Sequence, residues 1–320
     1  MGGEKALDAR CSSGTQKVHT LPDSTVGFQN MKRNKAWLHV AVFFALALLL
    51  VSCSDGDADR AAAGPAFVVK PLAASDRWTN TLSMVFAPLP GTRVLACVWE
   101  TRVQDFAAFA EATGFEPDYE LLTLRSDGWK HRAGFTWRTP NFPQQTNHPV
   151  VGMSWEDAHA FCDWLTEREQ QLLAIGRKQW YRLPTEAEWL IAAGSKKYPW
   201  GDEWPPPKGA GNYAGDEVRD NDWPTDFENI VGYRDDFVRT APVGSFATNA
   251  LGLFDVGGNV WEWCDNQDAS DKPRIMRGGS WYFGKQEYHL TSYYHTAPEN
   301  FGSSCLGFRV VLDVGGTANP

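Results

Sequence analysis

Cysteine is scarce in this chain, with six among 320 residues, and no CxxC motif or close pair occurs. Downstream of Cys53 only four remain, at separations of 65, 102 and 41 residues: Cys97, Cys162, Cys264 and Cys305. In an oxidising compartment these four can form up to two disulfides, and the sequence leaves all three connectivities open. No histidine stands at a spacing that indicates a reactive thiol, so the sequence favours structural cysteines.

Positive charge is also in short supply. The chain has 30 basic and 39 acidic residues, a formal net charge of −9, and no cluster of Lys and Arg interleaved with aromatic residues. This composition argues against nucleic acid as a partner. Fifteen tryptophans and 29 glycines argue against a helical bundle. They predict a single α+β domain that is irregular and rich in loops, with little regular secondary structure.

Only one long hydrophobic run is present, from Val40 to Val51, and it follows the basic stretch Met31–Lys35. Its 12 residues are short for a membrane span, which needs about 20. The run ends in Leu50-Val51-Ser52-Cys53, which fits a bacterial lipobox. We therefore expect lipidation of Cys53 and a domain on the exported side of the bacterial cell envelope, held to a membrane by the lipid. An uncleaved anchor helix is the alternative, and it gives the same location.

Changes in composition predict four parts of the chain. Residues 1–53 are an N-terminal extension and lipoprotein signal peptide, 54–66 a polar tether, 67–314 the folded domain and 315–320 a C-terminal tail.

Several elements are predicted within the domain. Residues 82–98 indicate a strand, a turn and a strand, and Thr101 is a candidate cap for a helix that ends near Gly114. Residues 115–150 show no period and are expected to be ordered loop, and Val150 and Val151 a short strand. Ser154 is expected to cap a second helix and Thr185, with Glu188, a third.

Paired glycines and tryptophans dominate residues 252–282, which contain GGNVWEW and RGGSWY, and LGFRV follows near the C-terminus. With RLPTEAEW at 182–189, these motifs resemble the sulfatase-modifying-factor family, whose type member is the formylglycine-generating enzyme. The resemblance implies the fold of that family, which is similar to the C-type lectin fold.

The resemblance also implies structural calcium, bound by oxygen ligands from separate loops. One expected site combines the side chains of Asn212 and Asp235 with the carbonyls of Tyr213 and Phe237. A second combines Asp255 and Glu262 with the carbonyls of Gly258 and Val260. The residues themselves leave alternatives open, because Asp236 can replace Asp235, and either Asp235 or Glu262 can be solvated or paired with an arginine. For Glu262, which stands between two tryptophans, metal binding is the favoured interpretation.

Formylglycine generation in the family depends on two cysteines that bind copper(I), and the matching positions here are Phe283 and Tyr288. Neither side chain binds copper(I), so copper is not expected. If catalysis survives, the candidate residues lie in or near the segment that lines the substrate groove of the family: Trp261, Ser280, Tyr288, His289 and His295.

Two functions remain open at this point. The first is a noncatalytic module that presents an aromatic groove to a peptide, a glycan or a protein of the cell envelope. The second is a copper-independent oxidoreductase that acts on a peptide or a small aromatic substrate, similar to the siderophore-maturation oxidases of the family. The sequence favours the first slightly, and it does not define a ligand.

Overall fold

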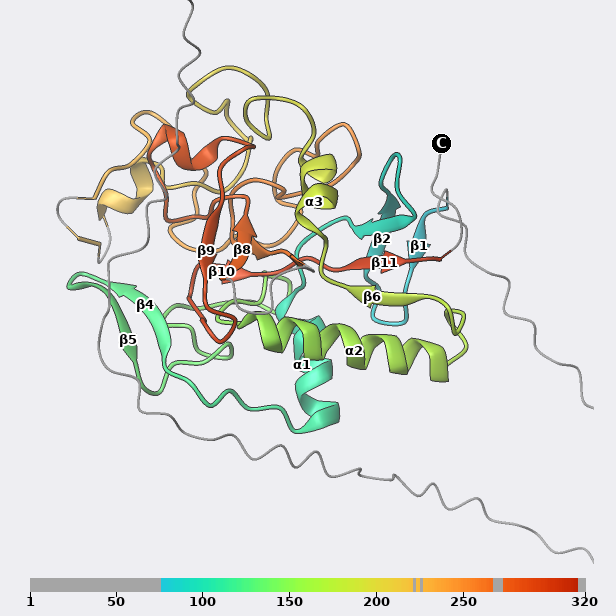
Figure 1. Cartoon of the computed structure of the whole chain (residues 1–320). Coiled ribbons are helices and arrows are strands. Elements are labelled where there is room, and N and C mark those ends of the chain that lie inside the picture. Colours follow the sequence, from blue (N-terminus) through green and yellow to red (C-terminus); the bar gives the residue numbers. More distant parts are fainter. Residues whose placement is uncertain (1–75, 221–222, 225–226, 267–272, 316–320) are drawn as a thin grey trace, which may run out of the picture. The chain divides into compact units, whose positions relative to one another are not determined.

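The computed structural model describes residues 76–220, 223–224, 227–266 and 273–315. The expected signal peptide, Cys53 and the tether therefore lie outside the described residues. The central element is a five-stranded antiparallel sheet in the order β1-β2-β3-β11-β6 (Figure 1). Its strands are β1 (Trp78–Thr79), β2 (Val85–Pro88), β3 (Val94–Cys97), β11 (Val311–Asp313) and β6 (Trp180–Arg182).

The expected strand, turn and strand at 82–98 are confirmed as β2 and β3. All four residues of β3 and all three of β11 are buried, which is why neither strand alternates between apolar and polar residues. The sheet thus pairs a strand near the start of the domain with one from its end.

Three α-helices accompany the sheet: α1 (Val103–Thr113), α2 (Trp155–Gln171) and α3 (Glu186–Ala193). Capping boxes start α2 at Ser154 and α3 at Thr185, as the sequence predicts. The prediction for α1 was one residue out, because Arg102 rather than Thr101 is its N-cap, and Asp105 completes that capping box. Gly114 ends α1 in the left-handed conformation at φ 71°.

A second sheet, in the order β10-β7-β8-β9, positions the motifs of the C-terminal half. Its strands are β10 (Leu306–Gly307), β7 (Trp261–Trp263), β8 (Arg274–Arg277) and β9 (His295–Ala297). Two short 3-10 helices lie in the connecting loops, η1 (Asp216–Asp220) and η2 (Gln286–His289). Glycine–tryptophan motifs therefore occupy strand ends and the loops that join them.

The expectation of an ordered loop over residues 115–150 was wrong in part, because an antiparallel hairpin forms there. Its strands are β4 (Leu121–Arg125) and β5 (Gly128–Arg132), joined by a tight turn. The hairpin presents Leu121 and Leu124 to the core and leaves Lys130 and His131 exposed. Val150 and Val151 are buried but form no strand, because only the neighbouring Pro149 makes an isolated bridge, to Arg102.

The predicted fold class is confirmed: short strands and three helices are joined by long loops, and aromatic rings fill much of the space between them. Phe106, for example, contacts the rings of Phe109, Trp137, Phe161 and Phe308. In the described part of the chain, no helix is both long and apolar enough to cross a membrane.

Candidate functional site

The candidate site lies on the loop that joins β8 to η2, residues 278–285. Two successive glycines, Gly278 at φ 101° and Gly279 at φ 74°, adopt backbone conformations that side-chain-bearing residues rarely take. A Cβ atom at Gly278 would also stand 3.2 Å from the carbonyl oxygen of Val256. These two positions therefore allow a turn after which Trp281 stays buried, Tyr282 and Phe283 are half-buried, and Lys285 is exposed.

A groove of about 490 Å³ opens beside this returning loop. Aromatic rings form much of its wall, and the exposed pair of Glu228 and Lys285, 3.0 Å apart, lies among the lining residues. The residues that line it are Gly128, Pro224, Phe227, Glu228, Tyr282, Phe283, Gly284, Lys285 and Tyr288. Its walls thus come from the β4–β5 hairpin turn, the loop around residue 228 and the segment before η2.

Phe283 and Tyr288, the two positions that the resemblance matches to copper-binding cysteines, both line this groove. The rings of Phe283 and Tyr288 pack against each other with their centroids 4.6 Å apart, and both side chains are half-buried. The buried ring of Trp261 packs against Phe283, with the two ring centroids 5.6 Å apart. These three rings therefore pack against one another at the groove.

His295 and Tyr293 stand behind the ring pair. The ring of His295 stacks on Tyr288 with centroids 6.1 Å apart, and its Nε2 atom lies 3.2 Å from the hydroxyl of Tyr293. Burial lowers the pKa of His295 to about 4 and raises the pKa of Tyr293 above its ordinary value. Both groups are therefore neutral at pH 7, which makes a proton transfer between them unfavourable.

The structure separates His289 from these residues. Its ring is buried against Trp200, Trp204 and Tyr213, with the nearest centroid 4.8 Å away at Tyr213. Neither ring nitrogen makes a hydrogen bond of normal geometry, and burial lowers the pKa to about 3. His289 does not line the groove, so it and His295 do not form a joint site.

Ser280 and Cys305 lie beneath the groove. Ser280 is fully buried, and its hydroxyl and that of Ser303 lie against the thiol of Cys305. Burial raises the pKa of Cys305 to about 11, so the thiol is protonated at neutral pH. All four cysteines of the described residues are buried and free, which supports the structural interpretation.

The residues expected to bind the first calcium ion are brought together. Asp235 is nearly buried, and the backbone N–H groups of Tyr213 and Phe237 donate to its two oxygens at 2.7 and 2.9 Å. Burial raises the pKa of Asp235 to about 7. The neighbouring Asn212 is fully buried, and its Oδ1 atom has no hydrogen-bond partner. An unpaired amide oxygen beside a buried carboxylate fits a hard cation.

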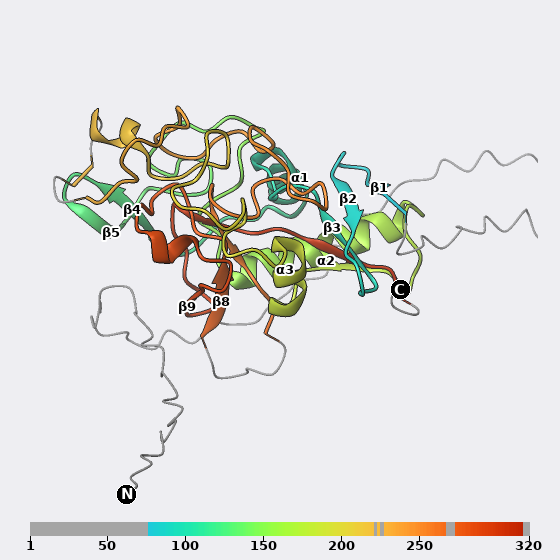
Figure 2. The ribbon, with the colours of Figure 1, turned by 90° about the horizontal axis from the view of Figure 1, so that it is seen from above.

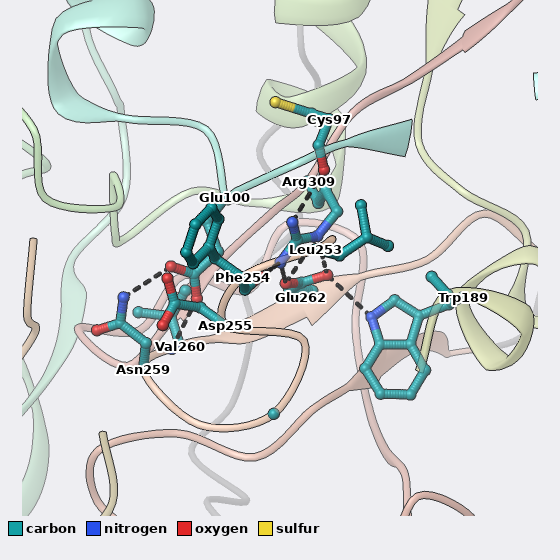
Figure 3. A network of polar contacts seen from close by, with 12 residues as sticks. Cys97, Glu100, Trp189, Leu253, Phe254, Asp255, Asn259, Val260, Glu262 and Arg309 are labelled. Atoms are coloured by element: carbon teal, nitrogen blue, oxygen red, sulfur yellow. Dashed lines mark hydrogen bonds and ion pairs between the residues drawn. The ribbon is translucent and has the colours of Figure 1, made fainter. Parts of the chain in front are cut away.

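The second expected calcium site does not fit in the same way, because Glu262 has an arginine partner. The guanidinium of Arg309 contacts both carboxylate oxygens, at 2.7 Å from Nη2 and 3.1 and 3.2 Å from Nε (Figure 3). Trp189 Nε1 donates to Glu262 at 2.9 Å. Both Glu262 and Arg309 are fully buried, so this ion pair balances the charge of the acid between two tryptophans without requiring a metal.

A further acidic residue that sequence reasoning missed, Glu100, lies next to this ion pair. Figure 3 shows its carboxyl group close to that of Asp255. Glu100 accepts from Asn259 Nδ2 at 2.7 Å and from the backbone N–H of Val260 at 3.2 Å. Burial, and then the charge of Asp255, raise its pKa well above the ordinary value. Glu100 therefore holds the GGNVWEW turn to the start of the domain.

The groove walls around Phe227 and Glu228 were also missed, because residues 223–229 carry no period or motif that points to them.

Among the described residues, no group of three or more His, Cys, Asp or Glu side chains is arranged to hold a metal ion. Together these features define a loop-rich α+β domain with a groove whose wall is largely aromatic.

Comparison with known proteins identifies the family to which this domain belongs. Residues 99–314 match the family described as "Sulfatase-modifying factor enzyme 1-like domain", and the chain belongs to that family. It is 30% identical over 256 residues to the formylglycine-generating enzyme of Streptomyces coelicolor, covering 65% of this chain and 74% of that protein. It is 33% identical over 196 residues to the inactive C-alpha-formylglycine-generating enzyme 2 of Bos taurus, covering 56% of each chain. The chain thus spans little more than half the length of that bovine relative.

Among solved structures, PvdO from Pseudomonas aeruginosa is similar at 19% identity and a TM-score of 0.49, covering 73% of this chain and 82% of PvdO.

Proposed function

We propose that this protein is a binding member of the sulfatase-modifying-factor family that generates no formylglycine and holds its ligand in the aromatic groove. The observation that carries the proposal is the packed ring pair of Phe283 and Tyr288, which fills the positions of the copper-binding thiols and lines the groove. Aromatic walls beside a charged pair suit a ligand with a flat apolar face and polar edges, such as a peptide or a glycan. A protein of the cell envelope can present such a face.

Binding arrays of peptides and glycans test this proposal with a matched pair of variants. We expect Tyr288→Ala to lower array binding about tenfold or more, because the ring forms part of the groove wall. Tyr294→Ala is the control, since Tyr294 is 41% exposed and does not line the groove. If the two variants lose array binding equally, or if neither loses any, the groove is not the binding site.

The alternative, a copper-independent oxidoreductase, is favoured by one observation, the contact of Tyr293 with His295 beside Tyr288. We expect no formylglycine on a sulfatase-type CxPxR peptide, and no oxygen uptake with thiols or catechols in the presence of copper or iron. The name of the bovine relative, which is described as inactive, agrees with this expectation. Oxygen uptake that is lost in His295→Ala would instead establish the oxidoreductase.

Export and lipid anchoring complete the proposal, on the strength of the lipobox at Cys53. We expect Cys53→Ala to move most of the protein from the membrane fraction to the soluble fraction, because the protein then loses its acyl anchor. Fractionation with detection of the full chain measures this. An unchanged membrane fraction in the variant would favour the anchor helix.

A single calcium ion at Asn212, Tyr213, Asp235 and Phe237 is the cofactor that we propose. The ion would take no part in a reaction. Its role would be structural, because it would link loops that no helix or sheet connects.

A further inference from the structure

The loop between α2 and β6, residues 172–179, exposes two leucines to solvent. Leu172 is 54% and Leu173 is 57% exposed, and they are adjacent in the chain. Leu172 also lines a hollow of about 230 Å³ beside the half-buried ring of Trp164. Isolated exposed leucines are ordinary on protein surfaces, whereas adjacent ones beside a tryptophan form an apolar patch. We name residues 172–180 the leucine loop.

Leu173 is held in an unfavourable backbone conformation. Its φ is 56°, in the left-handed region that favours glycine. Backbone hydrogen bonds fix this conformation, since Leu173 N donates to Gln170 O at 3.2 Å and Ala174 N to Glu169 O at 2.8 Å. A glycine would relieve the backbone and remove the exposed side chain. The bonds that end α2 account for the backbone conformation, and the exposed side chain is free to make a contact outside the domain.

Positive charge and an aromatic ring accompany the leucines. Arg177 and Lys178 are exposed, and Trp180 is 37% exposed with the guanidinium of Arg93 5.7 Å from its ring centroid. The exposed acid on the adjoining turn of α2 is Glu167, while Glu169 is buried and bonded to Thr81. On a chain of net charge −9, the leucine loop is thus a local site of positive charge.

The leucine loop lies at the end of the domain where the described chain begins. Trp78 of β1 donates from Nε1 to the hydroxyl of Tyr181 in β6 at 3.1 Å, and Thr81 bonds Glu169 of α2. Figures 1 and 2 both place β1 and the α2–β6 connection on one side of the domain, with the β4–β5 hairpin on the other. Cys53 precedes Asp76 by 23 residues, a stretch that reaches at most about 80 Å when extended.

We propose that the leucine loop is a membrane-contact site that inserts Leu172 and Leu173 among the headgroups of an anionic lipid surface. Leucine and tryptophan enter the interfacial region, and Arg177 and Lys178 face the anionic headgroups. The inference rests on the proposed attachment at Cys53, which keeps the loop near lipid. It also orients the domain, because the groove beside the β4–β5 turn then faces away from the membrane.

The test uses residues 54–320, the expected mature chain without the acylated cysteine, because the full chain keeps the hydrophobic run Val40–Val51 and the basic stretch before it, which would bind anionic vesicles without the loop. Its partition onto phosphatidylglycerol vesicles at low salt is compared with that of Leu172→Ser/Leu173→Ser and of Arg177→Glu/Lys178→Glu, each in the same background. Val231→Ser and Lys208→Glu are the controls, because Val231 is 73% exposed and Lys208 is exposed, and both lie outside the loop.

We expect each loop variant to lower the partition coefficient roughly tenfold, the controls to leave it unchanged, and phosphatidylcholine vesicles to bind weakly. Loop variants that partition like the controls, or a protein that binds no vesicles at all, overturn the proposal. So does equal binding to both lipids. Failure of the anchor itself is read separately, from whether Cys53→Ala changes the membrane fraction in cells.

Discussion

Glu262→Ala is expected to lower the free energy of unfolding by about 3–5 kcal/mol, the usual cost of removing one partner from a buried ion pair. The substitution leaves the guanidinium of Arg309 buried without its carboxylate, although Arg309 still donates to the carbonyls of Cys97 and Phe254 at 2.9 and 2.8 Å. It also removes the acceptor of Trp189. Chemical denaturation of the wild type and the variant measures the difference.

A double-mutant cycle separates the ion pair from the loss of packing. We expect Glu262→Gln with Arg309→Met to be more stable than the sum of the single changes predicts, by about 2 kcal/mol or more, because no unpaired charge stays buried. Asp202→Ala is the surface control, since Asp202 pairs with Lys196 but is half exposed, and it should cost under about 1 kcal/mol. A Glu262→Ala cost no larger than that of Asp202→Ala would contradict the buried pair.

Local chemistry made the helix starts predictable from the sequence. Ser154 and Thr185 are each followed three residues later by an acid, and a capping box needs only those four residues. The β4–β5 hairpin was missed because its strands show no clean alternation of apolar and polar residues, although Asp127-Gly128 at the turn between them is a turn signal that could have indicated it.

The partner of Glu262 could not be predicted for a different reason. Arg309 is 47 positions away in the sequence, and the parallel pairing of β10 with β7 brings the two segments together. A contact of this kind cannot be predicted from the spacing of residues in the sequence, so the sequence favoured a metal for a carboxylate that has an arginine partner. The groove could not be predicted for the same reason, because its walls come from three segments that are separate in the sequence.

Asp235 was identified from a motif, and its surroundings now give a second prediction of large effect. Chelation of calcium is expected to lower the melting temperature by roughly 5–10 °C at pH 8 and by much less at pH 5. The reason is that a bound cation favours the ionised carboxylate, which burial disfavours. Scanning calorimetry with and without chelator across this pH range is the measurement.

The sign follows from the pKa of Asp235, which burial raises from 3.8 to about 7 in the folded protein. Without calcium, the folded state holds this proton more tightly than the unfolded state. The group's stabilising contribution is therefore complete below pH 4 and is lost as the pH rises through about 7. That loss amounts to about 4 kcal/mol for a shift of this size. Calcium takes the place of the proton, so its own contribution must grow over the same interval.

Two variants decide whether Asp235 carries this behaviour. Asp235→Asn is expected to melt at nearly the same temperature with or without chelator. Without calcium, its stability should no longer decrease between pH 5 and pH 8. Asp236→Asn is the matched control, because Asp236 is 79% exposed, and it should respond to chelator and to pH like the wild type. A chelator response that persists in Asp235→Asn and disappears in Asp236→Asn would assign the cation to the neighbouring acid, since one carboxylate must then supply the charge that Asn212 and the two carbonyls lack.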